Sequence, residues 1–347
     1  MASPTSPPVD RPLRVASIGL GRWGHALAEA AAKSDRVRIV TCFTRTEEKR
    51  RAFADRFGCD HDASLDAVLE RGDVDGVVIT APNRHHREIA EAAANAGKHV
   101  FVDKPIALEI ADARAMIRAC DDAGVTLAVG ASSRFLRGHR VCRRLIEEGA
   151  LGNLAMVEAN YSNARGLHYT KADWQWYATG SPGGPLMQVA IHQIDNFLYL
   201  FGPMKRVSAE FRKVVTKSEI PDVCVLWVEF ESGLLGTLAT SFISPTTPSG
   251  RYTYTLNAYG DRANFYHDRW DGIHLLGADR DDRERVDYTE FSGFDYLIEE
   301  LDEFAAAVAE ARAPEVGGGE GLHVLTVVRA AMRSAELGRP VEIRELG

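Results

Sequence analysis

The sequence predicts an α/β Rossmann domain followed by an α+β domain, and three observations support this prediction. At 347 residues, the chain exceeds what one hydrophobic core usually serves. Up to about Glu148, short apolar runs alternate with amphipathic, Ala-rich segments, which is typical of βαβ units and a parallel sheet. After Gly152, strand-like runs follow one another with few helices between them, which indicates a mostly antiparallel sheet.

The same patterns locate the expected elements. The parallel strands are expected at Arg14–Leu20, Val37–Phe43, Gly76–Thr80, His99–Val102 and Val125–Val129. The strands of the second sheet are expected at Leu154–Tyr161, Arg206–Val215, Val223–Glu231, Gly236–Phe242, Tyr252–Tyr259 and Asn264–His267. Helices are expected at Pro185–Phe201, Phe294–Ala311 and Gly319–Leu337. We therefore expect a Rossmann domain over residues 13–150 and a second domain over 151–347, whose C-terminal helices could pack back on the first.

Composition and charge exclude several classes of protein. Hydrophobic residues make up 45% and charged residues 26% of the chain, which are ordinary globular proportions. The net charge of -8 argues against a nucleic-acid partner, because phosphate binding needs a clustered positive surface. The basic run Arg134–Arg144 is better explained as the solvated face of a helix than as a nucleic-acid patch.

Nothing in the sequence predicts secretion or a membrane span. Residues 1–12 contain four prolines and no apolar run, so we expect a flexible tail rather than a signal peptide. No stretch approaches the roughly 18 apolar residues of a membrane helix. The five cysteines are widely spaced without a C-x-x-C pair, so neither a disulfide framework nor a zinc site is expected. A cytoplasmic location fits best.

A dinucleotide fingerprint follows the first predicted strand. Gly19-Leu-Gly21-Arg-Trp-Gly24 would supply a tight turn, a close backbone approach to a pyrophosphate and tight helix–strand packing. The free N–H groups at the start of the next helix would face the phosphates. A Gly-rich loop between buried elements is the simpler alternative, but the strand before the motif and the helix after it favour a cofactor.

The end of the second strand decides which cofactor is expected. An acidic residue there would bind the ribose diol of NAD, but the chain has Phe43-Thr44-Arg45-Thr46. The Thr44 hydroxyl and the Arg45 guanidinium suit a 2′-phosphate. NADP is therefore the preferred cofactor and NAD remains open, because Arg45 could instead stack on adenine or point into solvent.

Two further segments predict a catalytic site. Asp103-Lys104-Pro105 ends a predicted strand, where doubly wound sheets bind ligands, and Lys104 there could hydrogen-bond a substrate oxygen. In the apolar helix Pro185–Phe201, a spacing of 100° per residue places four polar side chains on one face: Gln188, His192, Asp195 and Tyr199. Buried polar groups need partners, so this face is either a ligand site or an internally satisfied seam.

Together these motifs resemble the glucose–fructose oxidoreductase/inositol dehydrogenase/MocA family. The motifs that carry the resemblance are Gly19-x-Gly21-x-x-Gly24, Pro82-Asn83-x-x-His86, Asp103-Lys104-Pro105, and Gly183-Gly184 through His192-x-x-Asp195. The resemblance runs from Leu13 to about Leu337 with the motifs in family order. It implies a second domain with a large, open, mostly antiparallel sheet that often joins subunits, and hence a homodimer or homotetramer.

The resemblance also implies an activity and a set of site residues. Family members oxidise or reduce a secondary alcohol or ketone on sugars, cyclitols or related small molecules. Carried over by position, Lys104 would contact the reacting oxygen and His192 would transfer the proton. The positions that would bind the cofactor are Gly19, Gly21, Arg22, Trp23, Gly24, Thr44, Arg45, Ala81, Pro82, Asn83, His86, Asp103, Lys104 and Pro105.

Two departures from the family pattern affect these expectations. Asp103 stands where the family usually has glutamate, and the shorter carboxylate could keep the orienting role. Gln188 stands where the family usually has an aspartate, and glutamine cannot exchange a proton at neutral pH. Proton transfer would then fall to His192, whose ordinary pKa near 6.5 suits it, with Lys104 assisting.

Further candidates lie around the expected substrate pocket. Besides Gln188 and Asp195, the candidate substrate contacts are Arg134, His168, Trp174 and Trp176. A surface helix would explain Arg134 equally well, and oligomer packing would explain the tryptophans. No metal is expected, because His86 and its neighbour His85 have no matching ligand cluster nearby.

These expectations leave three functions open. The first is an NAD(P)-dependent dehydrogenase or reductase acting on CH–OH groups of a sugar or cyclitol, with Lys104 and His192 at the reacting oxygen. The second is a catalytically silent cofactor-binding sensor or scaffold, for which Gln188 would record the loss of proton chemistry. The third is an enzyme of the same fold that acts on non-carbohydrate diols such as aromatic dihydrodiols. The survival of both Lys104 and His192 favours an enzyme.

Overall fold

The computed structural model describes residues 11–279 and 281–346, so most of the expected N-terminal tail lies outside the described residues. The chain forms two compact units. The first ends at Phe135 and also takes in Phe291–Leu322, whereas the second combines Leu136–Glu290 with the chain from His323 onward. This division differs from one break near residue 150, because the chain returns to the first unit near its C-terminus.

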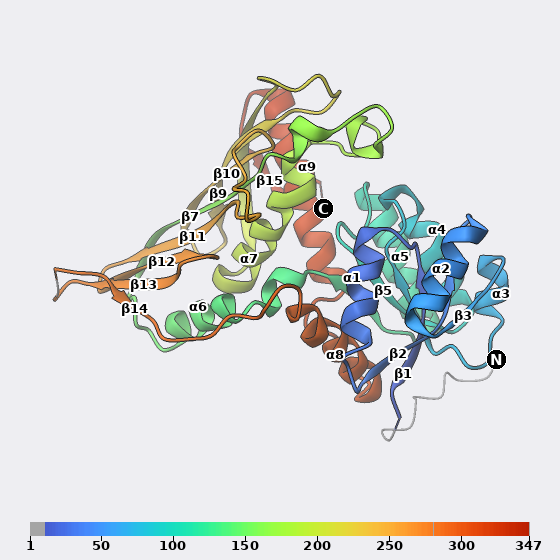
Figure 1. Cartoon of the computed structure of the whole chain (residues 1–347). Coiled ribbons are helices and arrows are strands. Elements are labelled where there is room, and N and C mark those ends of the chain that lie inside the picture. Colours follow the sequence, from blue (N-terminus) through green and yellow to red (C-terminus); the bar gives the residue numbers. More distant parts are fainter. Residues whose placement is uncertain (1–10, 280, 347) are drawn as a thin grey trace. The chain divides into compact units, whose positions relative to one another are not determined.

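The first unit is built on a six-stranded parallel sheet (Figure 1). Its strands are β1 (Leu13–Ile18), β2 (Val37–Phe43), β3 (Asp60–His61), β4 (Gly76–Ile79), β5 (His99–Asp103) and β6 (Leu127–Gly130). They are ordered β3-β2-β1-β4-β5-β6, so the strand order reverses between β1 and β4. In such sheets, ligands bind at the carboxyl ends of the strands beside this reversal. The predicted Rossmann domain is confirmed.

Helices cover the parallel sheet of the first unit. They are α1 (Arg22–Ala31), α2 (Glu47–Phe57), α3 (Leu65–Leu69), α4 (His86–Asn95), α5 (Ile110–Ala123) and α8 (Tyr296–Ala309). The helix α1 packs against α8, and α4 packs against α5. The short 3-10 turns η1 (Asn83–His85) and η2 (Ser132–Phe135) follow β4 and β6. The central strand β4 is apolar, and all four of its residues are buried.

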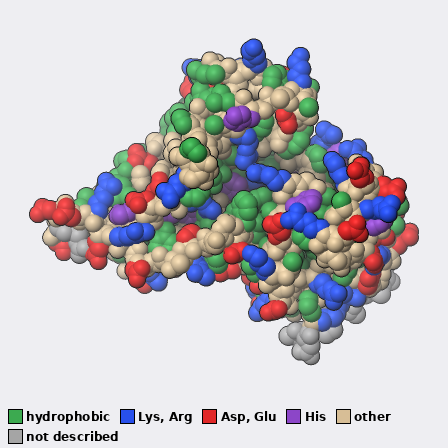
Figure 2. All heavy atoms as spheres, viewed as in Figure 1, with side chains coloured by type: hydrophobic (Ala, Val, Ile, Leu, Met, Phe, Trp, Pro, Cys, Tyr) green, Lys and Arg blue, Asp and Glu red, His purple; other side chains and the backbone are tan. Residues whose placement is uncertain are grey.

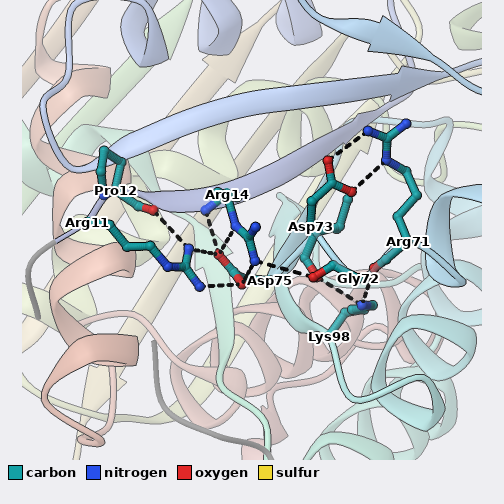
Figure 3. Close-up of polar contacts among 9 residues, drawn as sticks. Arg11, Pro12, Arg14, Arg71, Gly72, Asp73, Asp75 and Lys98 are labelled. Atoms are coloured by element: carbon teal, nitrogen blue, oxygen red, sulfur yellow. Dashed lines mark hydrogen bonds and ion pairs between the residues drawn. The ribbon is translucent and has the colours of Figure 1, made fainter. Parts of the chain in front are cut away.

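A charge network fixes the amino ends of the central strands (Figure 3). The Asp75 carboxylate accepts hydrogen bonds from the guanidinium groups of Arg11, at 2.6 Å, and Arg14, at 2.9 Å. Beside it, Lys98 donates to the carbonyl oxygens of Arg71 and Val74. Burial alone would raise the pKa of Asp75, but the two arginines outweigh it and hold that pKa well below its usual range.

The second unit contains a nine-stranded sheet that is antiparallel except where β10 runs parallel to β7. Its strands are β7 (Leu154–Ser162), β8 (Met204–Arg212), β9 (Val223–Phe230), β10 (Leu235–Ser241), β11 (Thr253–Gly260), β12 (Ala263–Asp268), β13 (Gly272–Gly277), β14 (Glu284–Arg285) and β15 (Val341–Glu342). The order β14-β13-β12-β11-β7-β10-β9-β8-β15 leaves two free edges. The predicted large, open, mostly antiparallel sheet is confirmed.

Helices pack on one face of the nine-stranded sheet. Those of this unit are α6 (Arg137–Glu147), the π-helical turn η5 (Leu186–Ala190) and α7 (Ile191–Phe201). The turn η5 contacts β7 and β10, whereas α6 contacts β12 and β13 (Figure 1). Short 3-10 turns lie at η3 (Arg165–His168), η4 (Trp174–Trp176) and η6 (Ile343–Glu345). The helix α9 (Gly318–Leu337) begins in the first unit and continues into the second.

Buried amides join α7 to the sheet. Gln193 donates to the carbonyl oxygen of Thr255 at 3.1 Å, and Asn196 donates to the Tyr254 hydroxyl at 3.0 Å. Both amide side chains are fully buried. Because buried polar groups are costly unless they are hydrogen-bonded, these contacts fix how α7 is rotated on the sheet.

Figure 2 shows how the charged side chains are distributed over one face of the molecule. Acidic and basic side chains intermingle over the face drawn in Figure 2 instead of forming one continuous basic patch. Among residues 11–279 and 281–346, no helix is long and apolar enough to cross a membrane.

Candidate functional site

The glycine loop meets the β4 loop at the point where the strand order reverses. Gly19 has a φ of +93°, which favours glycine, and a Cβ there would lie 2.5 Å from the backbone nitrogen of Ala81. A Cβ on Gly24 would lie 2.4 Å from the Gly19 carbonyl oxygen. The Thr80 hydroxyl donates to that carbonyl at 2.5 Å. These two glycines are therefore required by close backbone packing, as the fingerprint predicts.

Gly21 differs from its two neighbours, because nothing lies within 4 Å of where its Cβ would be. It is the N-cap of α1, where no side chain caps the helix and no acidic residue occupies the first turn. The first N–H groups of α1 are thus left for an anion. The open space and the uncapped helix start fit the pyrophosphate of a dinucleotide.

The loop after β2 presents Arg45 to solvent and is held from behind by Arg50. Arg45 is exposed and Thr44 is half-buried. The buried Arg50 donates to the carbonyl oxygens of Thr44, at 2.8 Å, and Arg45, at 3.2 Å. The backbone of this loop is therefore fixed while the Arg45 side chain extends outward, which fits recognition of a 2′-phosphate.

The end of β5 carries Asp103, Lys104 and Pro105, and the Lys104–Pro105 peptide bond is cis. The Asp103 carboxylate accepts hydrogen bonds from the Lys104 backbone N–H, at 2.9 Å, and from the Trp23 side chain. Burial raises the pKa of Asp103 to about 6, against the opposing effect of Lys104 and of these hydrogen bonds. Asp103 thus ties the β5 end to α1, whereas the Lys104 side chain is only half-buried.

His86 connects the two loops that flank this region. Its Nε2 lies 2.9 Å from the carbonyl oxygen of Ala81, and its Nδ1 lies 3.0 Å from that of Pro105. Burial lowers the pKa of His86, and the side chain has no exposed surface. We expected His86 to bind the cofactor, and its buried ring ties together the two loops at this end of the sheet. Any effect on a cofactor would pass through Ala81 and the Pro105 turn.

In the second unit, the predicted polar helix begins as a π-helical turn rather than as an α-helix. Gly183 and Gly184 precede it with φ values of +74° and +53°, and a Cβ on Gly184 would lie 2.3 Å from the Pro221 carbonyl oxygen. The 100° spacing therefore does not hold over residues 186–190, and Gln188 is rotated relative to the expected face. π-helical turns inside helices are frequent at functional sites.

The side chains of η5 and α7 are buried polar groups with defined neighbours. The Gln188 amide donates to the Ser181 hydroxyl at 2.9 Å, and both side chains are buried. The ring of His192, which is half-buried, lies 6.1 Å from the Tyr161 ring. Asp195 is buried one turn further on. The structure thus keeps Gln188, His192 and Asp195 together on one helix.

Tyr199 belongs to a different contact. Arg140 donates to its hydroxyl at 2.8 Å, and the Arg143 guanidinium lies 4.6 Å from its ring centroid. Tyr199 lies on the same face of α7 as His192 and Asp195, one turn further on, and it packs there against α6.

The four remaining candidates for substrate contact lie in different surroundings. Arg134 is neither on a helix surface nor exposed, because it is 4% exposed and donates to the Glu315 carbonyl oxygen at 3.3 Å. His168 is exposed at the end of η3. Trp174 and Trp176 are half-buried in η4. Their loop is fixed locally, since the Glu219 N–H donates to the Trp176 carbonyl oxygen at 2.9 Å.

Several residues that contact the predicted site residues were not identified from the sequence. Thr80, Arg50, Ser181 and Tyr161 each contact a predicted site residue from another segment. The sequence gives no signal for Arg50 or Ser181, because their partners depend on how the chain turns. Within the described ranges, no three His, Cys, Asp or Glu side chains are arranged to hold a metal ion.

Comparison with known proteins identifies the family. Residues 13–131 match the model described as "Oxidoreductase family, NAD-binding Rossmann fold", and residues 143–343 match its "C-terminal alpha/beta domain". The chain belongs to the glucose–fructose oxidoreductase/inositol dehydrogenase/MocA family. It is therefore an NAD(P)-dependent oxidoreductase.

Relatives match over nearly the whole chain. Myo-inositol 2-dehydrogenase of Thermotoga maritima is 27% identical, covering 96% of this chain and 99% of its own. D-apiose dehydrogenase of Paraburkholderia graminis is 27% identical, covering 95% and 90%. Among solved structures, a provisionally named NADPH-dependent oxidoreductase of Desulfitobacterium hafniense is 36% identical with a TM-score of 0.90, covering 97% and 99%. Levoglucosan dehydrogenase bound to NADH and levoglucosan shares the fold, with a TM-score of 0.86 at 24% identity over 96% and 100%.

Proposed function

We propose that this family member interconverts a secondary alcohol and a ketone on a sugar, cyclitol or similar small molecule, with NADP as the preferred cofactor. The observation that carries the proposal is the buried polar helix of the second unit. Gln188, His192 and Asp195 stand there in an otherwise apolar segment. Relatives named for inositol and apiose support a polyhydroxylated substrate, whose hydroxyl groups such side chains would bind.

The chain's own residues would orient the substrate and move the proton. When bound, the nicotinamide would supply or accept the hydride. Lys104 would donate a hydrogen bond to the reacting oxygen, and His192 would hold the proton that leaves or joins it. Gln188 cannot exchange that proton, so its amide would bind a neighbouring hydroxyl. Asp103 would keep the segment before Lys104 fixed through Trp23.

The cofactor preference rests on the loop after β2. Arg45 is exposed there, its backbone is held by Arg50, and Phe43-Thr44-Arg45-Thr46 contains no carboxylate to bind a ribose diol. The relative from Desulfitobacterium hafniense is named for NADPH, which agrees with this preference. Titration of the purified protein with NADPH and NADH, followed by fluorescence, measures it directly.

The catalytic roles are tested by Lys104→Ala and His192→Ala. Each should lower turnover on a polyol and ketose panel by about 10²- to 10⁴-fold while NADPH binding stays intact. Two exposed residues, Lys213 and His61, provide the matched controls Lys213→Ala and His61→Ala. Normal turnover in either catalytic variant would sink its assigned role. Tight cofactor binding with no turnover on any alcohol would instead favour a silent sensor.

We also propose that the chain assembles as a homodimer or homotetramer through its large sheet. The face opposite the helices carries apolar side chains from three adjacent strands: Met156, Val225, Trp227, Leu235 and Ala239. Leu235 and Val225 are 53% and 52% exposed. Exposed apolar side chains grouped on one sheet face favour an interface, here with a second copy of the chain. Light scattering that gives a monomer mass at working concentration would contradict it.

A further inference from the structure

The fold brings together two cysteines that are far apart in sequence. Cys42 lies in β2 and is fully buried, whereas Cys59 follows α2 and is half-buried. Both pack in one apolar cluster, whose other members include Leu20 and Phe53. The α2 helix (Glu47–Phe57) lies between them in the sequence.

The two thiols are not equivalent. They form a hydrogen bond to each other. This bond, aided by burial, raises the pKa of Cys42, and the bond lowers the pKa of Cys59. Burial and Asp60 oppose the second effect. The thiolate is the reactive form of cysteine, so the more accessible Cys59 is the nucleophile and Cys42 is the partner that closes on it.

A short chain of contacts joins this pair to the loop that presents Arg45. The Cys42 thiol donates to the backbone carbonyl of Arg50 at 3.6 Å. The Arg50 guanidinium in turn holds the carbonyl oxygens of Thr44 and Arg45. Replacing the Cys42 S–H by a sulfur–sulfur bond removes the first of these contacts and draws the end of α2 toward β2.

The remaining cysteines have different surroundings. Burial raises the pKa of Cys120 and of Cys224 to about 12, and it raises that of Cys142 as well. Each therefore stays a thiol at neutral pH, which is the unreactive form.

We propose that Cys42 and Cys59 form a reversible dithiol–disulfide couple that weakens cofactor binding when it is oxidised by a low-molecular-weight disulfide such as oxidised glutathione. The effect on affinity rests on the proposed NADP preference at the Thr44–Arg45 loop. The couple itself does not depend on that preference.

The oxidation proceeds in two exchange steps. The Cys59 thiolate attacks one sulfur of the small disulfide, forms a mixed disulfide and releases one thiolate. Cys42 then loses its proton and attacks the Cys59 sulfur, which releases the second thiolate. Two protein thiols are oxidised to one disulfide, and one small disulfide is reduced to two thiols. Dithiothreitol reverses both steps.

The experiment treats the folded, full-length protein with oxidised glutathione and measures three quantities. Peptide mass spectrometry should find a bond between Cys42 and Cys59 that dithiothreitol removes. NADPH affinity should fall by about fivefold or more, and NADH affinity by less, because the 2′-phosphate contacts are the ones disturbed. Hydrogen exchange of amides 44–50 should become faster, since the Arg50 contacts loosen.

Two variants serve as controls. Cys59→Ser should bind NADPH like the reduced protein and lose all sensitivity to oxidised glutathione, whereas Cys120→Ser should keep the full response. Failure to form the bond in the folded protein would overturn the proposal, as would a bond that changes neither affinity nor exchange. If the reduced protein binds neither cofactor, the proposed function fails. Hydrogen exchange of amides 44–50 before and after oxidation then remains as the test of the Cys42–Cys59 couple.

Discussion

The candidate cofactor site of the first unit is formed mainly by backbone atoms, whereas the polar helix of the second unit presents side chains. At the β1–β4 reversal, backbone atoms and the space left by missing side chains make the site, through Gly19, Gly21 and Gly24. Along η5 and α7, polar side chains form the candidate site, through the buried Gln188, the half-buried His192 and their neighbours from other segments. A site made of backbone is specified by local residue spacing, whereas a site made of side chains depends on long-range packing.

The first prediction breaks the backbone-built site at two neighbouring glycines. Gly19→Ala should destabilise the first unit by about 3 kcal/mol, because the new Cβ meets the Ala81 backbone and φ is positive. Gly21→Ala should leave the free energy of unfolding within about 0.5 kcal/mol of the parent but abolish NADPH binding, since it fills open space at the α1 start. Urea unfolding and fluorescence titration measure the two effects.

Gly58 provides the matched control for backbone strain alone. Its φ is +65° and nothing lies within 4 Å of its Cβ position, so Gly58→Ala should cost only about 1 kcal/mol and leave NADPH binding intact. Equal losses in Gly19→Ala and Gly58→Ala would show that close packing adds nothing at the glycine loop.

The same distinction explains how much the sequence could predict. The alternating pattern correctly predicted both domains' fold class, because buried parallel strands and the second sheet differ in hydrophobic period. It missed β13 (Gly272–Gly277), and it missed the short strands β3, β14 and β15, which span two residues each and have no periodicity. The predicted helical face changes at Gln188, where the π turn alters the angle per residue, whereas at Tyr199 the sequence could not indicate the partner that α6 supplies.

The second prediction tests side-chain contacts in the first unit, away from its glycines. Asp75→Asn should lower the free energy of unfolding by about 2 kcal/mol at pH 7, because Arg11 and Arg14 lose their charged acceptor. The pKa of Asp75 is lower in the folded than in the unfolded protein, so its contribution is complete above about pH 4 and is lost as the pH falls through the folded value.

Urea unfolding of parent and variant between pH 7 and pH 3 checks this dependence. The difference between them should stay constant down to about pH 4 and shrink below it, while NADPH binding at pH 7 stays unchanged in both. A constant difference across the range would show that Asp75 stabilises the unit through shape rather than through charge.

The third prediction concerns Arg45, a side chain that we expect to contact the cofactor beside the glycine loop. Arg45→Ala should weaken NADPH binding by about tenfold and leave NADH binding nearly unchanged, because only the 2′-phosphate needs the guanidinium. The NADPH effect should shrink at high salt, since Arg45 is exposed and its charge is screened. An equal loss for both cofactors would instead place Arg45 on the adenine or the backbone of the loop.

The smallest expected effect tests whether the side-chain-built site depends on its distant partners. Ser181→Ala removes the acceptor that the buried Gln188 amide uses, which should cost about 1 kcal/mol in unfolding free energy. If Gln188 binds substrate, loss of the Ser181 contact should also raise KM more than it lowers kcat, while NADPH affinity is unchanged. In the parent background, Gln188→Asp keeps a partner for the Ser181 hydroxyl, because the new carboxylate can accept a hydrogen bond from it. This variant should therefore fold normally and change substrate preference. A Ser181→Ala protein with parental KM on every substrate would make the Gln188–Ser181 contact purely structural, and the polar helix would then be an internally satisfied seam at this end.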